Sequence, residues 1–102
     1  MWQYQELGIG QSWQVVTSSR SFNTLYSNTT NKPITVFFTG YTTQTWAAFY
    51  SVVNGVTIGI CEGAGGYYVA SMNFIVPAGT TYKVTWTSGG DTPTIYLWAE
   101  LR

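Results

Sequence analysis

Short segments rich in β-branched and aromatic residues, separated by turn-forming residues about every 8–12 positions, constrain this chain more than any other feature. Between the turns, Thr, Val, Ile, Tyr, Phe and Trp predominate, and these residues favour a pleated, half-buried strand. No stretch places apolar residues at the i, i+3, i+4 and i+7 positions of an amphipathic helix over three turns. The pattern predicts an all-β fold, an antiparallel β-sandwich of about eight strands.

The strongest local signal is Asn54-Gly55, which lies between Val53 and Val56. Asn-Gly between β-branched residues predicts a two-residue type I′ hairpin, because both central positions need positive φ. The expected strands are Trp13–Thr17, Phe22–Ser27, Ile34–Thr39, Trp46–Val53, Val56–Ile60, Tyr68–Val76, Tyr82–Thr87 and Thr94–Leu101.

The last expected strand alternates between two kinds of face. Ile95, Leu97, Ala99 and Leu101 form an apolar face that we expect to be core, with Tyr96, Trp98 and Glu100 on the opposite face. Large aromatic side chains outside a core are typical of subunit interfaces. We therefore expect Tyr96 and Trp98, together with Trp13, to lie at a subunit interface, with a second packed layer or a ligand platform as alternatives.

Charge is scarce in this chain. Charged residues make up 8% of the 102 residues and the net charge is zero, whereas an ordinary soluble domain has about 25% charged residues. Four scattered cations cannot form a basic surface for nucleic acid or a polybasic membrane signal. Because 18% of the residues are aromatic, some of these rings must lie at an interface or on a binding face.

Residues for catalysis are mostly missing. The chain has no histidine, which removes Ser-His-Asp and Cys-His arrangements and His-based metal sites. Cys61 is the only cysteine, so no internal disulfide can form, and no nearby cation lowers its pKa. Glu62 and Asp91 could serve as a glycosidase pair, but a domain of this size has little room for a cleft. We expect no enzyme activity, no metal and no cofactor.

The length predicts a single domain, which we place at residues 7–102. Residues 1–6 are interpreted as the end of a preceding segment, or as the point at which a longer chain was cut. They do not form a signal peptide, and no apolar run approaches the ~20 residues that span a membrane. Asn28-Thr29-Thr30 fits a glycosylation sequon, which a Thr-rich chain carries easily by chance.

Three segments, at residues 40–46, 62–68 and 88–92, mix aromatic side chains with neutral hydrogen-bonding groups. Aromatic rings stack on the apolar faces of sugars, and Tyr and Trp provide contact area at low entropic cost. Ordinary exposed turns are the alternative interpretation. The binding residues that we predict are Tyr41, Thr42, Gln44, Trp46, Glu62, Tyr67, Tyr68 and Asp91.

Several stretches, taken in their order, resemble the C-terminal domain of tail fibres from tailed bacteriophages and prophages. They are LGIGQSW at residues 7–13, Arg20 followed by NTLYSNTT at 23–30 and KPI at 32–34, VNGV at 53–56, IVPAGTTYKV at 75–84, and the closing WAELR at 98–102. Each stretch alone is a common turn or strand pattern. Their order and the closing Glu-Leu-Arg make the resemblance specific, and it spans nearly the whole chain.

This resemblance implies the distal tip of a long fibre. The tip would be a β-sandwich homotrimer whose shaft precedes Met1 and would end within residues 1–6. It further implies a virion protein, assembled in the host cytoplasm, that attaches to a bacterial surface receptor, either a lipopolysaccharide glycan or an outer-membrane protein. It implies no catalytic residues and identifies no receptor contacts. A trimer would accommodate the surplus aromatic residues, and threefold display would raise the avidity of weak sugar contacts.

Two functions from other classes remain open. A monomeric carbohydrate-binding module that serves a separate enzyme would have the same size and aromatic content, and the oligomeric state separates it from a fibre tip. A structural trimerising cap without receptor binding would share the trimer, and only a binding assay separates it. A small glycosidase would instead show turnover that is lost when Glu62 or Asp91 is changed.

Overall fold

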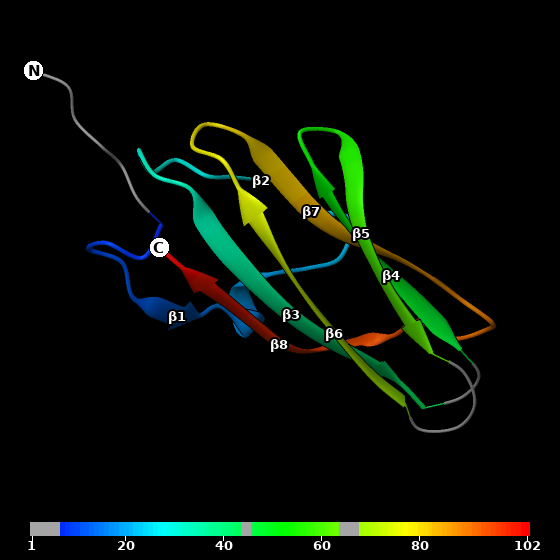
Figure 1. The fold of residues 1–102 in the computed structure, drawn as a ribbon. Coiled ribbons are helices and arrows are strands. Elements are labelled where there is room, and N and C mark those ends of the chain that lie inside the picture. The colour runs from blue at the N-terminus through cyan, green and yellow to red at the C-terminus, as the bar shows by residue number, and fades with distance from the viewer. Residues whose placement is uncertain (1–6, 44–45, 64–67) are drawn as a thin grey trace, which may run out of the picture.

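The computed structural model describes residues 7–43, 46–63 and 68–102, which form an all-β fold (Figure 1). Eight strands are present, as expected, with one 3-10 turn, η1, after the first. The elements are β1 (Trp13–Val15), η1 (Thr17–Ser19), β2 (Tyr26–Ser27), β3 (Ile34–Thr42), β4 (Ala47–Val53), β5 (Val56–Gly63), β6 (Tyr68–Val76), β7 (Thr81–Ser88) and β8 (Thr94–Leu101).

The first two strands are shorter than the sequence pattern predicts. β1 ends before η1 begins at Thr17, and β2 is reduced to Tyr26 and Ser27. Asn23 adopts a φ of 59°, a left-handed conformation that an extended strand does not contain. The segment between η1 and β2 is therefore a loop that carries Phe22 towards the core, where its ring stacks on Phe49 at 5.9 Å.

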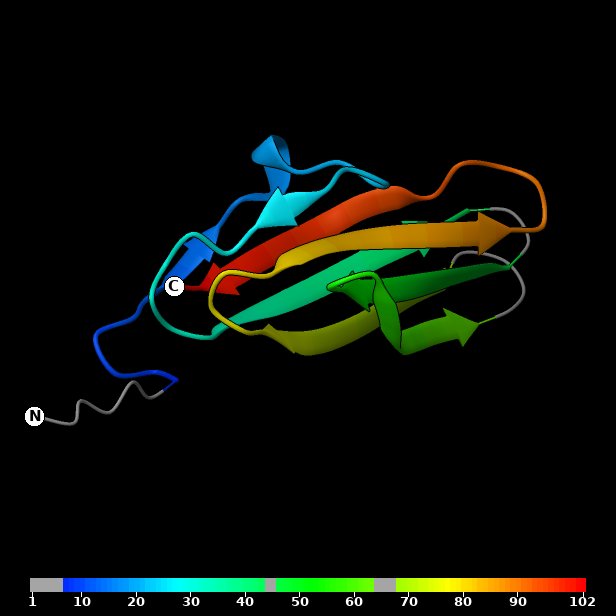
Figure 2. The ribbon, with the colours of Figure 1, turned by 90° about the horizontal axis from the view of Figure 1, so that it is seen from above.

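Two four-stranded antiparallel sheets pack face to face (Figures 1 and 2). Sheet A has the order β1-β8-β3-β6, and sheet B has the order β2-β7-β4-β5. With every neighbouring pair antiparallel, this connectivity is that of a double Greek-key jelly roll. The expected β-sandwich is therefore confirmed, and its chain path alternates repeatedly between the two sheets.

The strand registers define two ends of the sandwich. Ile34 pairs with Val76, Val53 with Tyr82, and Trp13 with Leu101, so these residues mark one end, here called the proximal end. Thr42 pairs with Tyr68, and Ala47 pairs with both Gly63 and Ser88, so these mark the opposite, distal end. The C-terminus and the segment leading into β1 lie at the proximal end (Figures 1 and 2).

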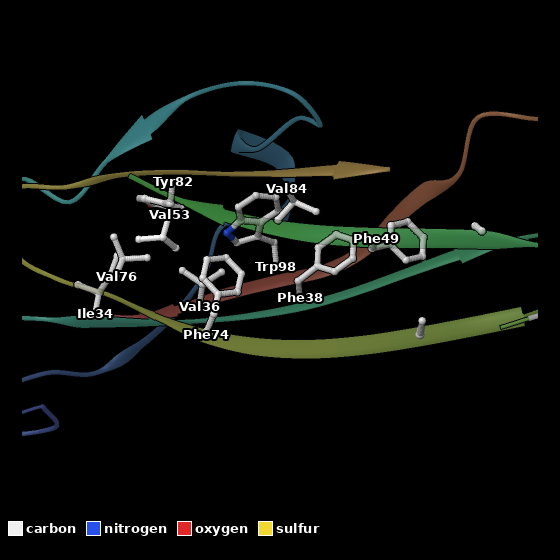
Figure 3. Close-up of a cluster of buried hydrophobic side chains, with 12 residues drawn as sticks. Ile34, Val36, Phe38, Phe49, Val53, Phe74, Val76, Tyr82, Val84 and Trp98 are labelled. Carbon is white, nitrogen blue, oxygen red and sulfur yellow. The ribbon is translucent and has the colours of Figure 1, made fainter. Parts of the chain in front are cut away.

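The inner faces of the two sheets form one aromatic-rich core (Figure 3). Phe38 of sheet A lies 5.1 Å from Phe49 of sheet B and 5.8 Å from Trp98, measured between ring centroids. Such pairs each add about 0.5–1.5 kcal/mol to the stability gained by burial. Tyr82 and Val84 point into this core with Trp86 packed against it, which confirms the alternation expected in β7.

The hairpin between β4 and β5 has the expected geometry. Asn54 and Gly55 have φ values of 52° and 77°, the positive values that a type I′ turn requires. Gly40 is needed for a different reason, because a Cβ there would lie 2.7 Å from the Phe38 ring and 2.8 Å from the Phe49 ring. The core rings therefore pack directly over the β3 backbone at Gly40.

The predicted faces of β8 were wrong. The register between β3 and β8 shifts between Thr39, which pairs with Leu97, and Gly40, which pairs with Ile95. Tyr96 is the extra residue of this β-bulge, and it reverses the in-out alternation of the strand around it. Ile95 and Trp98 consequently point inward, whereas Tyr96 is 67% exposed.

The same bulge overturns the interface assignment of Trp98. Its side chain is fully buried in the core of the protomer and so cannot contact another subunit. Leu97, Ala99 and Leu101, expected in the core, lie on the outer side of sheet A and are partly exposed. Trp13 and Tyr96 remain on the outside of sheet A.

Candidate functional site

The described ends of the three segments with predicted binding residues lie at the distal end of the sandwich. The connections β3–β4, β5–β6 and β7–β8 all join strands there, as the registers of Thr42, Ala47 and Tyr41 show. Figures 1 and 2 show this end opposite the C-terminus. Segments that are about 20 residues apart in the chain therefore share one surface.

Two predicted binding residues, Thr42 and Asp91, are in direct contact. The buried Thr42 hydroxyl donates a hydrogen bond to Asp91 Oδ1 at 3.0 Å. Ser88 Oγ donates to the Asp91 carbonyl at 2.5 Å and accepts the Gly90 amide at 3.3 Å. These contacts fold the β7–β8 connection into a compact turn and fix it to the end of β3.

Trp46 also lies at this end, immediately before β4. Its carbonyl oxygen accepts a hydrogen bond from the Gly89 amide at 3.0 Å, which joins it to the same turn. Its side chain is 41% exposed, so the main chain is held while part of the ring faces solvent. A partly exposed indole whose main chain is fixed, at the same end as the half-buried Asp91 carboxylate, can stack on a ligand while the carboxylate accepts hydrogen bonds from it.

Tyr41 and Tyr96 form an aromatic pair where the outer face of sheet A approaches the distal end. Their ring centroids are 6.1 Å apart with an interplanar angle of 76°, an edge-to-face arrangement. Sequence reasoning assigned Tyr41 to a binding loop and Tyr96 to an interface, and did not place them together. The β8 bulge that turns Tyr96 outward depends on pairing with β3, which no local pattern reveals.

The remaining predicted binding residues are placed only in part. Glu62 is exposed near the distal end of β5, on the outer side of sheet B, where it pairs with Ala48. Tyr68 begins β6 opposite Thr42, but its side chain is not described, and Gln44 and Tyr67 lie outside the described residues. Within the described ranges there is no pocket and no cluster of three potential metal ligands.

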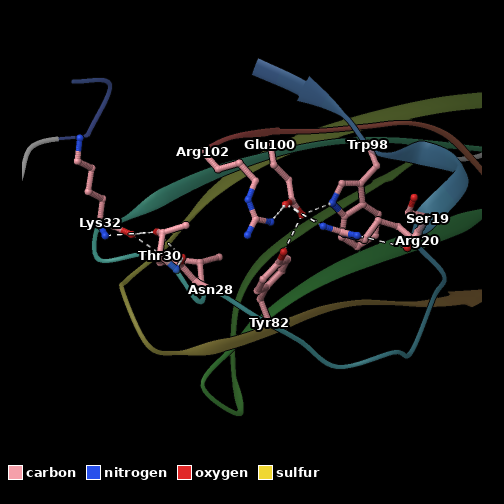
Figure 4. A network of polar contacts seen from close by, with 10 residues as sticks. Ser19, Arg20, Asn28, Thr30, Lys32, Tyr82, Trp98, Glu100 and Arg102 are labelled. Atoms are coloured by element: carbon pink, nitrogen blue, oxygen red, sulfur yellow. Dashed lines mark hydrogen bonds and ion pairs between the residues drawn. The ribbon is translucent and has the colours of Figure 1, made fainter. Parts of the chain in front are cut away.

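The proximal end contains a polar cluster that sequence reasoning missed (Figure 4). Glu100 is fully buried, and its carboxylate accepts bonds from four side chains. Arg20 donates twice, at 3.1 and 2.9 Å, and Arg102 Nη1 donates at 2.6 Å. Tyr82 Oη donates at 2.7 Å and Trp98 Nε1 at 3.0 Å.

This cluster alters the acid–base behaviour of its members. Burial raises the pKa of the Glu100 carboxyl, but the bonds from Arg20, Tyr82, Trp98 and Arg102 outweigh burial and hold this pKa below its ordinary value. Burial and then the bond to Glu100 raise the pKa of Tyr82 to about 12. Glu100 is thus a structural anion, satisfied by its own protein, and not a free catalytic carboxylate.

Asn28, the first residue of the sequon, has a structural role at the same end. It is buried, and its Nδ2 donates to the carbonyl oxygens of Lys32 at 2.8 Å and Val76 at 3.0 Å. Its Oδ1 accepts the Thr30 amide at 3.0 Å and the Thr30 hydroxyl at 2.6 Å. A side chain bonded in this way fastens the loop before β3 to the end of β6 and is not presented for glycosylation.

Comparisons with protein-family models, with curated proteins and with solved structures found no match. Among the described residues, no helix has the length and hydrophobicity needed to cross a bilayer. A jelly roll alone supports many functions, so the function of this chain has to be inferred from the site itself and from the sequence resemblance.

Proposed function

We propose that this chain is the receptor-binding tip domain of a bacteriophage tail fibre, a homotrimer in the virion that attaches to a glycan or protein on the bacterial surface. Binding is non-covalent and takes place at the distal end of the sandwich. The observation that carries the proposal is that the strands flanking all three segments with predicted binding residues end there, with the partly exposed Trp46 ring and the Asp91 carboxylate at the same end.

The polarity of the fold supports this proposal. The chain enters β1 at the proximal end, so a preceding shaft would hold the domain there and leave the distal end facing outward. Binding residues generally lie on loops that a rigid scaffold positions. The Greek-key arrangement provides such a scaffold. Viral capsid and lectin domains also have the jelly-roll architecture, and the comparison with them is an analogy at the level of the fold.

The chemistry of the distal end favours sugar-like or polar surface ligands. Trp46 exposes part of its ring at this end, where the half-buried Asp91 also lies. Asp91 keeps a second carboxylate oxygen beyond the one that accepts the Thr42 bond. Individual contacts of this kind are weak, and threefold display would increase the overall avidity by orders of magnitude.

The test is binding of the fluorescently labelled chain to a panel of whole bacteria and immobilised lipopolysaccharides. We expect Trp46→Ala to reduce binding at least tenfold, because it removes the exposed ring. Asp91→Asn should also reduce binding while its amide oxygen still accepts the Thr42 bond. Leu25→Ala is the matched control, since Leu25 is an exposed apolar residue beside β2.

Three outcomes decide between the alternatives. Selective loss of binding by the two distal variants, with unchanged mass and melting temperature, supports the proposal. Binding of both variants at the wild-type level would overturn it. Absence of wild-type binding to every member of the panel would also count against it and favour a structural cap.

A further inference from the structure

The outer face of sheet A is a broad surface that no other described strand of the protomer covers. It consists of the outward residues of β1, β8, β3 and β6, which the registers place in common rows. Its most exposed members are Trp13, Val15, Val69, Ile75 and Tyr96, each more than half exposed. Its polar members are Thr, Ser and Asn, so the face is apolar with uncharged interruptions.

No charged residue lies among the described positions of this face. The charges lie elsewhere: Arg20, Glu100 and Arg102 form the proximal cluster, and Asp91 belongs to the distal turn. Lys32 lies in the loop before β3. Lys83 and Glu62 belong to sheet B, where β7 also presents a row of threonines to solvent. The two outer faces thus differ in kind, and only that of sheet A lacks charge entirely.

The flat area of this face is that of a large apolar patch, smaller than a standard interface before side-chain relief is added. The four strands together contain 29 residues, so at about 3.3 Å per residue and about 4.8 Å of width per strand the flat area is roughly 460 Å². Side-chain relief makes the accessible area larger than this flat projection. A standard interface uses about 800 Å² per partner, whereas the largest apolar patch of a typical monomer covers about 300–600 Å².

We propose that copies of this chain associate through the outer face of sheet A, which faces the axis of the oligomer. An uncharged face can meet another uncharged face without burying an unpaired charge, and a second copy supplies such a face. Strand β1 is part of this face, so packing here also brings together the points at which the chains enter the domain. The number of copies, three, rests on the proposed function.

Two matched substitutions test this assignment in the 102-residue chain. Ile75 on sheet A and Ile60 on sheet B are 52% and 57% exposed, so a lysine at either position has room in the protomer. By light scattering on a sizing column at tens of micromolar, we expect wild type and Ile60→Lys at about three times 11.3 kDa. Ile75→Lys should elute at the mass of one chain. Val15→Lys, at a position 70% exposed, should do the same.

Each outcome bears on the assignment separately from receptor binding. A one-chain mass for wild type, or a three-chain mass for both Ile75→Lys and Val15→Lys, overturns it. Dissociation of Ile60→Lys as well would also overturn it, because the face would then have no special role. If dissociation is selective but Trp46→Ala still binds cells normally, the interface stands and the proposed receptor function fails. If the wild-type chain binds cells but stays a monomer, the proposed receptor function stands and the interface assignment fails.

Discussion

The two ends of this sandwich are held together in different ways. At the proximal end, Glu100 is fully buried and accepts bonds from four side chains, and Asn28 makes four side-chain bonds of its own. At the distal end, the described side-chain contacts between strand and turn are the bond from Thr42 to Asp91 Oδ1 and the bonds of Ser88 Oγ to the Asp91 carbonyl and the Gly90 amide. Aromatic side chains there are partly exposed, as in Trp46 and Tyr96.

This difference assigns stability to the proximal end and, under the proposed function, recognition to the distal end. The proximal end joins the first and last strands, which a fibre would pull on, and its bonds link residues up to 80 positions apart. The distal end carries loops whose residues can change at little cost to the fold, which would suit the receptor-binding surface that we propose. Substitutions at the proximal end should therefore alter unfolding, and those at the distal end should alter binding.

The largest effect should come from Glu100→Gln. The substitution leaves Arg20 and Arg102 without their anion and directs an amide group at donors that need an acceptor. Removing one partner of a buried ion pair costs about 3–5 kcal/mol in the free energy of unfolding. Denaturant unfolding measures the loss, and Glu62→Gln, an exposed carboxylate on β5, should change stability by less than about 0.5 kcal/mol.

The pH dependence of unfolding tests whether the negative charge of Glu100 is the cause of this stabilisation. Because the folded-state pKa of Glu100 is lowered, its stabilisation is complete above the ordinary carboxyl pKa of about 4.3 and is lost as the pH falls through the folded value. Wild type should therefore lose its advantage over Glu100→Gln in acid. A constant difference between the two proteins from pH 7 to pH 2 would contradict the role assigned to the carboxylate.

A smaller loss is expected from Asn28→Ala. The substitution removes two donated and two accepted bonds and leaves the Val76 carbonyl without its Asn28 partner, which should cost about 2 kcal/mol. Asn31→Ala is the matched control, because Asn31 is exposed in the same loop. Equal melting temperatures for the two variants would show that the proximal loop is not held by Asn28.

Local features of this fold could be predicted from the sequence, and features that depend on pairing could not. Asn54-Gly55 and the alternation from Tyr82 to Trp86 depend only on neighbouring residues, and both are confirmed. The faces of β8 depend on a bulge opposite Gly40, where the Phe38 and Phe49 rings leave no room for a side chain. A strict two-residue period therefore misplaced Trp98.

The candidate functional residues also come together only through contacts between distant segments of the chain. Composition marked each distal loop separately, but only the connectivity of the jelly roll brings the three loops to one end. Glu100 was visible as one of few charges, yet its partners Tyr82 and Arg20 are 18 and 80 residues away in the chain. A buried carboxylate becomes recognisable only when those donors are placed around it.

The smallest effect should come from Thr42→Val, which removes the hydrogen bond from the Thr42 hydroxyl to Asp91 at the distal end. Valine preserves the shape of the buried side chain, and Asp91 remains partly accessible to water, so the cost should be about 1 kcal/mol. Thr43→Val, one residue on and exposed, should cost less than about 0.5 kcal/mol. If Thr42→Val instead destabilised the fold as much as Asn28→Ala, the distal end would be as firmly built as the proximal end. Stability and recognition would then share the same bonds, and a receptor contact at Asp91 would have to be reconciled with a structural one.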